Sequence, residues 1–513
     1  MLLLLLACSS PDDTGKLDDT GDPNDTADTA DTGETADTGE TGPITLAPGE
    51  VADMVTTGDG VSVSLTEPGN YIVILVSTAP EQGTLYGYAE KASDGARTSA
   101  RGSRPAARAS VPPVAAAAAS VVAEGDHRSF VVSDGARRVT IDALATRVTD
   151  AVVVWEDQTT PNEIGMIDET TVDGVLAAFT DIVTPRERQV FGDESDVNGD
   201  GKVDILLSYT VNQTGAVAYV SWCDIGVGTG CSGWSNDSEV VYMGIPDPES
   251  DYSSVDGITE TFAHEFNHLI YAWHKYGAND QPEAAENVYL TEGMSALAQD
   301  LSGYNNGNQY VWAAALDGTS VYEDEDYSVQ GISWNDVLRG RGYYDADRDG
   351  PLRGAGYLYL RYLFEQAGGL VVNADGTLTD AGGMAWLHTF FDAAALGEAA
   401  VEETTGRTLE DIGLDWYTAL VVTGRVENDN PAWNYQPQVV DPLTGYAFGM
   451  DPYTTIHGWW TLTGPLVQKL NRADGEIRAG GVEYLETNVN GPETLTLAVD
   501  PGAAPRARIL RVE

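Results

Sequence analysis

The segment His264-Glu265-Phe266-Asn267-His268 constrains this chain more than any other. Apolar residues surround it, which predicts a buried helix over residues 255–276. Residues four apart lie on one face of an α-helix, so both imidazoles can bind one metal ion. Glu265 is then placed to accept a proton from a water molecule on that metal. The motif therefore predicts a zinc centre with His264 and His268 as ligands and Glu265 as general base.

Catalytic zinc needs three protein ligands and one open position, and two residues compete for the third place. Glu292 opens a second predicted helix, 287–301, in which Gly293 and neighbouring small residues allow close packing beside the first helix. His274 extends the motif to the metzincin spacing, but Tyr271 stands where that pattern normally has glycine. On an unbroken helix, at 100° per residue, His274 lies roughly 120° around from His268 and points away from the metal. We therefore expect Glu292 to be the third ligand.

Further segments carry a family resemblance. The chain resembles the hyicolysin-like bacterial metallopeptidases of the gluzincin type over roughly residues 121–424, through TFAHEFNHLI (261–270), LTEGMS (290–295) and GYLYLRY (356–362). The resemblance implies a zinc endopeptidase with protein or peptide substrates, and it supports Glu292 over His274. It also implies an α+β zincin-type domain, with a β subdomain, the active helix and a helical C-terminal subdomain. We nominate Tyr357, on a later predicted helix over residues 354–367, as the donor that stabilises the oxyanion of the transition state.

A loop rich in oxygen ligands follows the first predicted helices. Its ligand positions match the first nine places of an EF-hand loop, with Gly201 at the sixth, and are occupied by Asp196, Asn198, Asp200, Lys202 and Asp204. Leu207 stands where that loop needs a glutamate, and a strand follows instead of a helix. The pattern predicts a structural Ca²⁺ site on a β scaffold. The same residues also favour a simple turn.

The N-terminus has the features of an export signal. Leu2 to Leu6 precede Ala7 and Cys8, which resembles a bacterial lipobox, although no Lys or Arg comes before the leucines. We expect residues 1–7 to be a signal segment and Cys8 to carry a lipid. Residues 8–45 repeat Asp, Thr and Gly and predict a disordered tether. The expected location is therefore the bacterial cell envelope, on the outer membrane or cell surface, with release from it as the alternative.

The remaining chain divides by composition. Alternating apolar residues predict a small β module at 46–93, an Ala/Pro/Arg linker follows at 94–120, and the zinc domain occupies 121–430. A second β module is expected at 431–513. Cys223 and Cys231 lie close together in a Gly-rich segment of an exported chain, which favours a disulfide.

Charge and composition restrict the partners. The 80 acidic and 27 basic residues give a net charge of −53, which repels phosphate backbones and anionic lipids. We expect no nucleic-acid partner, membrane contact only through the lipid anchor, and a monomer. Three alternative functions stay open at this point: a metzincin-like peptidase that uses His274, a non-catalytic binding or adhesion protein on a zincin fold, and a zinc hydrolase of non-peptide bonds.

Overall fold

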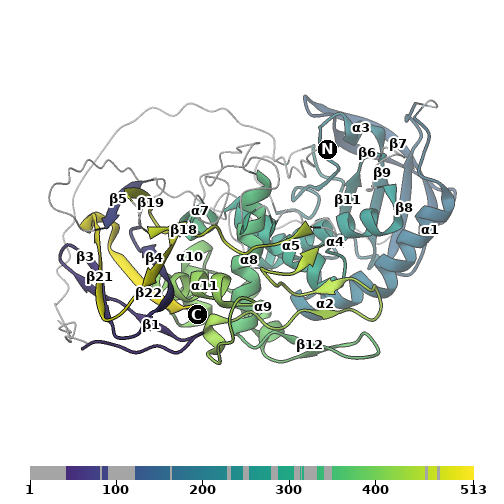
Figure 1. Ribbon diagram of the computed structural model, residues 1–513. Coiled ribbons are helices and arrows are strands. Elements are labelled where there is room, and N and C mark those ends of the chain that lie inside the picture. Colours follow the sequence, from purple (N-terminus) through teal and green to yellow (C-terminus); the bar gives the residue numbers. More distant parts are fainter. Residues whose placement is uncertain are drawn as a thin grey trace, which may run out of the picture.

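The computed structural model describes residues 42–80, 84–90, 122–161, 164–227, 231, 233–246, 253–278, 287–305, 312–313, 315–316, 332–339, 349–456, 460–470 and 474–513. The expected signal segment, Cys8 and the linker at 94–120 lie outside these residues. The described chain is a mixture of helices and sheets, as expected, with a six-stranded sheet at one end, a β-sandwich at the other and helices between them (Figure 1).

A six-stranded sheet forms the first layer of the expected zinc domain. Its strands follow the order β10-β11-β9-β8-β7-β6, and β8, β9 and β11 are parallel. The strands are β6 (His127–Ser133), β7 (Arg138–Val148), β8 (Val152–Asp157), β9 (Val203–Leu207), β10 (Ala218–Val220) and β11 (Val240–Met243). Val203–Leu207 is buried along its whole length, as expected for a parallel strand that is covered on both faces.

Helices cover one face of this sheet. The helical segments along this part of the chain are α1 (Glu169–Ala178), the π-helix η1 (Phe179–Val183), α2 (Thr184–Phe191), α3 (Tyr209–Asn212) and α4 (Val255–Ala272). Val154 and Ile205 share a core with Phe262 of α4, whereas Val153 and Leu206 point into a separate core on the opposite face. Alternate side chains of each strand thus pack into two different hydrophobic cores, one on each face of the sheet.

The helix α4 carries the HExxH motif and is buried from Ile258 onwards. The hydroxyl of Ser254 accepts a hydrogen bond from the amide of Gly257 and caps its N-terminus. The α-helix ends at Ala272 and continues as a π-helix, η3 (Trp273–Ala278). The predicted helix over residues 255–276 is thus confirmed, although its last turns are of the wider π type and not α-helical.

Two further helices complete this layer: the first packs beside α4, and the second packs on the first. They are α5 (Val288–Ser302) and α8 (Asp349–Gln366). A Cβ atom on Gly293 would lie 2.6 Å from the carbonyl carbon of Gly356, so the backbones of α5 and α8 are in direct contact. The small residues of α5 were expected to allow close packing on α4; Gly293 faces α8 instead, and Ser295 faces α4.

The rest of the helical region surrounds α8. It comprises α7 (Trp334–Arg339), α9 (Gly383–Asp392), α10 (Gly397–Thr405), α11 (Leu409–Val422) and the 3-10 turn η6 (Pro431–Trp433), with the short pairs β12 (Leu370–Val372) and β13 (Leu378–Asp380), β14 (Val439–Val440) and β15 (Ala447–Phe448), and β16 (Thr455–Ile456) and β17 (Trp460–Thr461). Within the described residues, no helix is both long and apolar enough to cross a membrane.

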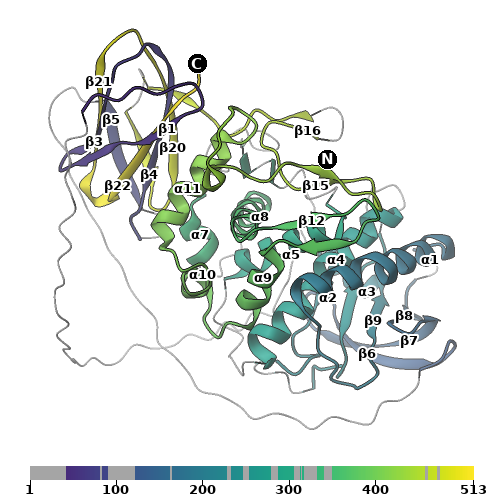
Figure 2. The same ribbon diagram turned by 90° about the horizontal axis from the view of Figure 1, so that it is seen from below.

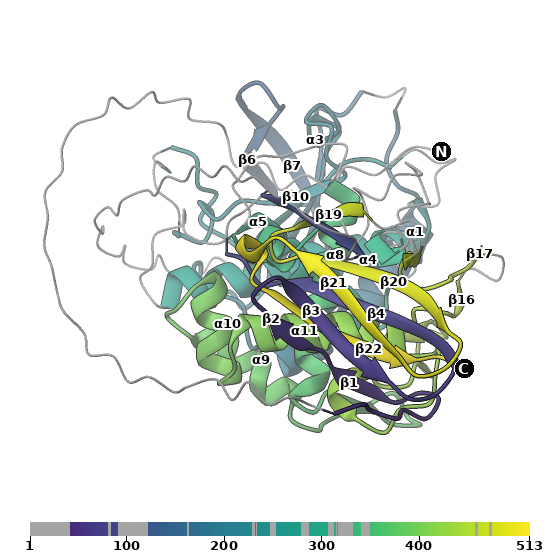
Figure 3. The ribbon, with the colours of Figure 1, turned by 60° about the vertical axis from the view of Figure 1, so that its left-hand side comes forward.

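The two ends of the described chain form one β-sandwich (Figures 2 and 3). One sheet has the order β1-β22-β4-β20-β18 and the other β19-β5-β21-β3-β2. The strands are β1 (Val51–Asp53), β2 (Val55–Thr57), β3 (Gly60–Leu65), β4 (Gly69–Ser77), β5 (Leu85–Glu90), β18 (Gln468–Lys469), β19 (Asp474–Arg478), β20 (Val482–Val489), β21 (Glu493–Val499) and β22 (Pro505–Arg511), with the 3-10 turn η8 (Pro501–Ala503) before the last.

This sandwich corrects the expected division into separate β modules at 46–93 and 431–513. Strand β4 lies between β20 and β22, with Ile74 opposite Tyr484 and Val73 opposite Ile509. Neither end alone could bury β4, whose residues from Tyr71 to Ser77 are all buried. The C-terminal boundary also moves, because Tyr435 donates to the carbonyl of Leu358 and residues before β18 belong to the helical region.

Candidate metal centre

Three side chains from α4 and α5 converge in the interior. His264, His268 and Glu292 are buried, and one ligand atom from each lies within 4.8 Å of the others. The Glu292 carboxylate approaches His264 Nε2 at 3.1 Å and His268 Nε2 at 3.6 Å. Across the parts of the chain that the structure describes, no other group of three His, Cys, Asp or Glu side chains meets in this way. The structure thus brings together the three ligands expected from the sequence.

The chemistry of these donors fits a zinc ion. Two imidazole nitrogens and one carboxylate are a ligand set of catalytic zinc. Burial, with His264 and Arg353 nearby, lowers the pKa of His268 to about 3, so this imidazole is neutral and has a lone pair to donate. Burial would raise the pKa of Glu292, but Arg353 and His264 hold it below its usual value, so the carboxylate is ionised. Its buried Oε1 accepts no hydrogen bond from the described residues and is open to a cation.

Glu265 follows His264 on the same helix. Its side chain is buried, and burial, with Glu292 nearby, raises its pKa to about 7 despite the opposing effect of His264. One carboxylate oxygen, Oε2, has no hydrogen-bond partner among the described residues. A carboxyl group with a pKa near neutrality can both accept and return a proton, which is what a general base must do in each cycle.

Second partners hold the two imidazoles, and the sequence did not identify them. His264 Nδ1 lies 3.1 Å from Oε1 of Gln299, whose amide donates to the carbonyl of Glu260. His268 Nδ1 lies 3.2 Å from the hydroxyl of Ser295. Both partners are on α5, three and seven residues after Glu292, so helical spacing places them on the face that carries the carboxylate. That spacing was the signal available in the sequence.

A third residue that the sequence analysis missed is Arg353. It lies on α8, its side chain is buried, and its Nη1 donates to Oε2 of Glu292. Arg353 is one turn before Gly356, whose backbone touches Gly293. The helix contact therefore brings the guanidinium to the carboxylate.

The structure gives no support to the nomination of Tyr357 as oxyanion donor, because its hydroxyl is bound to another side chain. Its hydroxyl donates to Oδ2 of Asp300 at 2.8 Å, and Arg361 donates to the same oxygen at 2.5 Å. All three side chains are buried, in a polar network that joins α8 to α5. Residues on α8 differ in direction by 100° each, and the sequence alone did not fix the phase of this helix.

His274, the competing third ligand, lies elsewhere. Its Nδ1 contacts Asp392 at 2.7 Å and its Nε2 contacts the carbonyl oxygen of Asp193 at 3.0 Å. It follows the end of α4, on η3, and binds α9 to the loop after α2. His274 is not among the convergent ligands.

The expected calcium loop forms a turn that satisfies its own oxygens. Asp196 accepts from the amide of Gly201, Asn198 from that of Asp200, and Asp200 from that of Lys202. Asp204 belongs to β9 and accepts from Arg128 at 2.6 Å and from the indole of Trp155 at 2.7 Å. Including Asp204 as a ligand was therefore wrong, because its alternation on the strand turns it into the sheet. Calcium binding by the other residues stays a prediction without support from the structure.

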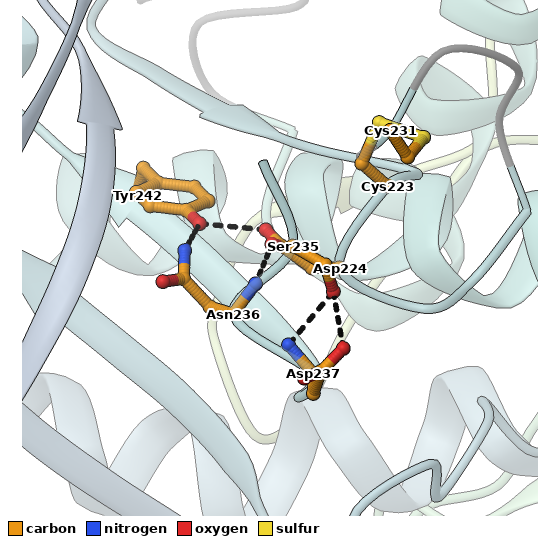
Figure 4. The surroundings of a disulfide bond; sticks show 7 residues. All are labelled: Cys223, Asp224, Cys231, Ser235, Asn236, Asp237 and Tyr242. Carbon is orange, nitrogen blue, oxygen red and sulfur yellow. Dashed lines mark hydrogen bonds between the residues drawn. A yellow bond between two sulfur atoms is a disulfide. The ribbon is translucent and has the colours of Figure 1, made fainter. Parts of the chain in front are cut away.

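The two cysteines are joined. Cys223 and Cys231 form a disulfide with Cα atoms 5.2 Å apart (Figure 4). Beside it, the buried carboxylate of Asp224 accepts hydrogen bonds from the hydroxyl of Tyr242 and the amide of Asn236, both at 2.6 Å. The bridge thus closes a loop whose base is fixed to β11.

Comparison with known proteins adds little. Neither the protein-family models nor the curated proteins contain a match to this sequence. Among solved structures, the chain is similar to a mutant of an M1 zinc metallopeptidase from Deinococcus radiodurans, with 13% identity and a TM-score of 0.25 over 60% of this chain. The match spans about half, 54%, of that protein. A likeness this distant says nothing about the function of the site, which is therefore inferred from the arrangement of its side chains.

Proposed function

We propose that this protein is a zinc-dependent endopeptidase of the gluzincin type. The observation that carries the proposal is the convergence of His264, His268 and Glu292 beside a buried, unpaired Glu265 oxygen. An adhesion or binding protein has no need of a carboxyl group held in this position. A metzincin-like enzyme would need His274, which contacts Asp392 and Asp193.

The chain's own residues account for the proton transfers. A zinc ion held by His264, His268 and Glu292 would lower the pKa of a coordinated water towards neutrality and polarise the scissile carbonyl. Glu265 accepts the proton of the attacking water and passes it to the leaving amine. Gln299 and Ser295 fix the orientation of the two imidazoles through Nδ1 and so direct Nε2 to the metal.

We also propose the setting in which this enzyme works. Export, a lipid on Cys8 and the Asp/Thr/Gly tether would hold the folded part away from the cell envelope, where it would cleave proteins or peptides. Radiolabelled palmitate should label the wild-type chain in a bacterial host but not Cys8→Ser. Equal labelling of both proteins would contradict the anchor.

The proposed activity is tested with metal content and cleavage of quenched fluorescent casein measured together. The wild-type chain should carry one zinc and cleave casein. Glu265→Gln should keep the zinc and lose cleavage by about 10²-fold or more, because only proton transfer is removed. Glu292→Ala should lose both, and the control His274→Ala should keep both. Zinc bound without any cleavage would favour the binding-protein alternative, and zinc lost only in His274→Ala would contradict the ligand set.

A further inference from the structure

The two oxygens of the Glu292 carboxylate have different surroundings. Oε2 accepts from Arg353 Nη1 and lies 3.1 Å from His264 Nε2. Oε1 accepts no hydrogen bond from the described residues, and it is the oxygen that approaches His268 Nε2, at 3.6 Å. Oε2 is therefore bound to Arg353 and also lies against His264, whereas Oε1 lies against His268 and has no hydrogen-bond donor among the described residues.

We propose that Arg353 is a positioning residue that keeps Glu292 a one-oxygen ligand. The guanidinium holds Oε2 and fixes the plane of the carboxylate, so Oε1, which has no hydrogen-bond donor among the described residues, is the oxygen presented to the metal. The inference rests on the proposed function, since it concerns a metal held by His264, His268 and Glu292. A carboxylate that binds through both oxygens would fill a further place in the coordination shell, whereas one oxygen leaves that place for water and substrate.

The backbone fixes Arg353 in this place. Gly293 follows Glu292 directly, and its Cα touches the turn of α8 that contains Gly356. A Cβ atom on Gly356 would lie 2.7 Å from the carbonyl oxygen of Tyr289, so no side chain separates the two helices. Arg353 lies one turn earlier on α8 and is only 7% exposed. The guanidinium cannot turn to solvent from there without α5 and α8 moving apart, and its charge is stabilised only while it is paired.

A simpler reading is that Arg353 only neutralises a buried acid. Arg361, two turns further along α8, does this for Asp300, which lies two turns after Glu292 on α5 and is not among the convergent ligands. If Arg353 only neutralises charge, Arg353→Met and Arg361→Met should both destabilise the fold, and neither should change how the metal is bound. The positioning role predicts a change in metal coordination for Arg353 alone. Arg361 is thus the matched control, because it is a buried, paired arginine of the same helix.

The test uses cobalt in place of zinc, because the visible spectrum of cobalt reports coordination number. The full chain is stripped of metal, loaded with one equivalent of Co²⁺ and compared as wild type, Arg353→Met, Arg353→Lys and Arg361→Met. The wild-type spectrum should be the intense band of four-coordinate cobalt. In Arg353→Met the molar absorbance should fall about threefold as the second oxygen of Glu292 joins the shell, since metal geometry follows the ligands offered. Arg353→Lys keeps the cation but loses the planar fork, so its absorbance should fall less.

The cobalt spectra distinguish a failure of the positioning role from a failure of the proposed function. An unchanged spectrum in Arg353→Met, or an equal fall in Arg361→Met, would overturn the positioning role and leave the proposed function intact. A weak five-coordinate spectrum in the wild-type chain would overturn it as well, even if Arg353→Met failed to fold. A wild-type chain that takes up neither zinc nor cobalt would overturn the proposed function itself.

Discussion

At the scale of single residues, the second partners of the ligands determine which nitrogen meets the metal. Gln299 turns its carboxamide oxygen to His264 because its Nε2 donates to the Glu260 carbonyl at 3.2 Å. A carboxamide oxygen only accepts, so Nδ1 of His264 carries the proton, and Nε2 would be the nitrogen that offers its lone pair to a bound zinc ion. The orientation of one amide thus sets the tautomer of a metal ligand.

Replacing that amide should weaken metal binding. We expect Gln299→Leu to raise the dissociation constant for zinc about 10- to 100-fold, because His264 loses the acceptor that fixes its ring. Competition with a chromogenic chelator measures this constant. Gln189→Leu is the control, since Gln189 also donates to a backbone carbonyl, that of Leu378, but has no contact with the ligands. Equal affinities in wild type and Gln299→Leu would show that Gln299 does not orient His264.

Asp224 should make stability depend on pH. Burial raises its pKa to about 7, against the lowering effect of Tyr242 and Asn236. Between the unfolded pKa near 4 and the folded pKa, the folded state binds more protons, so this group's contribution to stability is fully present at low pH and is lost as pH rises. Relative to Asp224→Asn, the free energy of unfolding of the wild type should fall between pH 5 and 7 by up to about 1.4 kcal/mol per pH unit.

Urea denaturation of both proteins at pH 5, 6, 7 and 8 measures this difference. The exposed neighbour Asp237 provides the control variant Asp237→Asn, which should show no such trend. A wild-type stability that rises with pH relative to Asp224→Asn would reverse the sign and contradict the assignment.

The sequence was sufficient to predict which three side chains converge, but not which residues contact them from behind. His264, Glu265 and His268 share a motif whose spacing has few other uses, and Glu292 follows in a helix with small neighbours. Arg353 and Tyr357 lie one turn apart on α8, and only the packing of Gly356 on Gly293 reveals which side chain contacts Glu292. Contacts between helices that are distant in sequence have no local signal.

At the scale of elements, the site depends on how closely α5 and α8 approach. We expect Gly356→Ala to destabilise the fold by about 1–3 kcal/mol and to weaken zinc binding, because its Cβ would push against the Tyr289 carbonyl and separate Arg353 from Glu292. Gly350→Ala, on the same helix, meets nothing within 4 Å and should be neutral or slightly stabilising. Thermal denaturation and zinc titration of both variants test the contrast, and equal behaviour of the two would contradict it.

Helix boundaries were predicted less well than helix positions. The sequence predicts a helix at 354–367 where α8 spans Asp349–Gln366, because Gly350 and Pro351 indicate a turn. Proline is compatible with the first turn of a helix, where its missing N–H has no partner to lose, so the helix begins earlier. The π-helix after Ala272 was not predicted either; it carries His274, whose partner Asp392 is more than a hundred residues away in the sequence.

At the scale of the whole molecule, the part of the chain that carries the convergent ligands is inserted into a β-sandwich. Strands β1 to β5 precede it and β18 to β22 follow it, yet they alternate within the same sheets. The sandwich is tied to the helical region by Tyr484, which donates to the carbonyl of Tyr417, and by Arg508, which pairs with Asp415. The sequence indicated the strands at both ends. Which strands pair across some four hundred residues, however, cannot be predicted from the residues of either segment alone.

This insertion predicts that a cut chain stays together. If a specific protease site is engineered into residues 94–120 and cleaved, the two fragments should co-elute in size-exclusion chromatography, because β4 remains paired with β20 and β22. They should separate only in denaturant. Separation under native conditions would show that the N-terminal strands form a module of their own.

The central claim is that His264, His268 and Glu292 hold one zinc ion, and X-ray absorption at the zinc edge of the purified wild-type chain tests it most directly. We predict one zinc per chain, with two imidazole nitrogens and oxygen ligands at about 2.0–2.2 Å and no sulfur. A shell with three imidazoles or with sulfur at about 2.3 Å, or the absence of stoichiometric zinc, would contradict the claim.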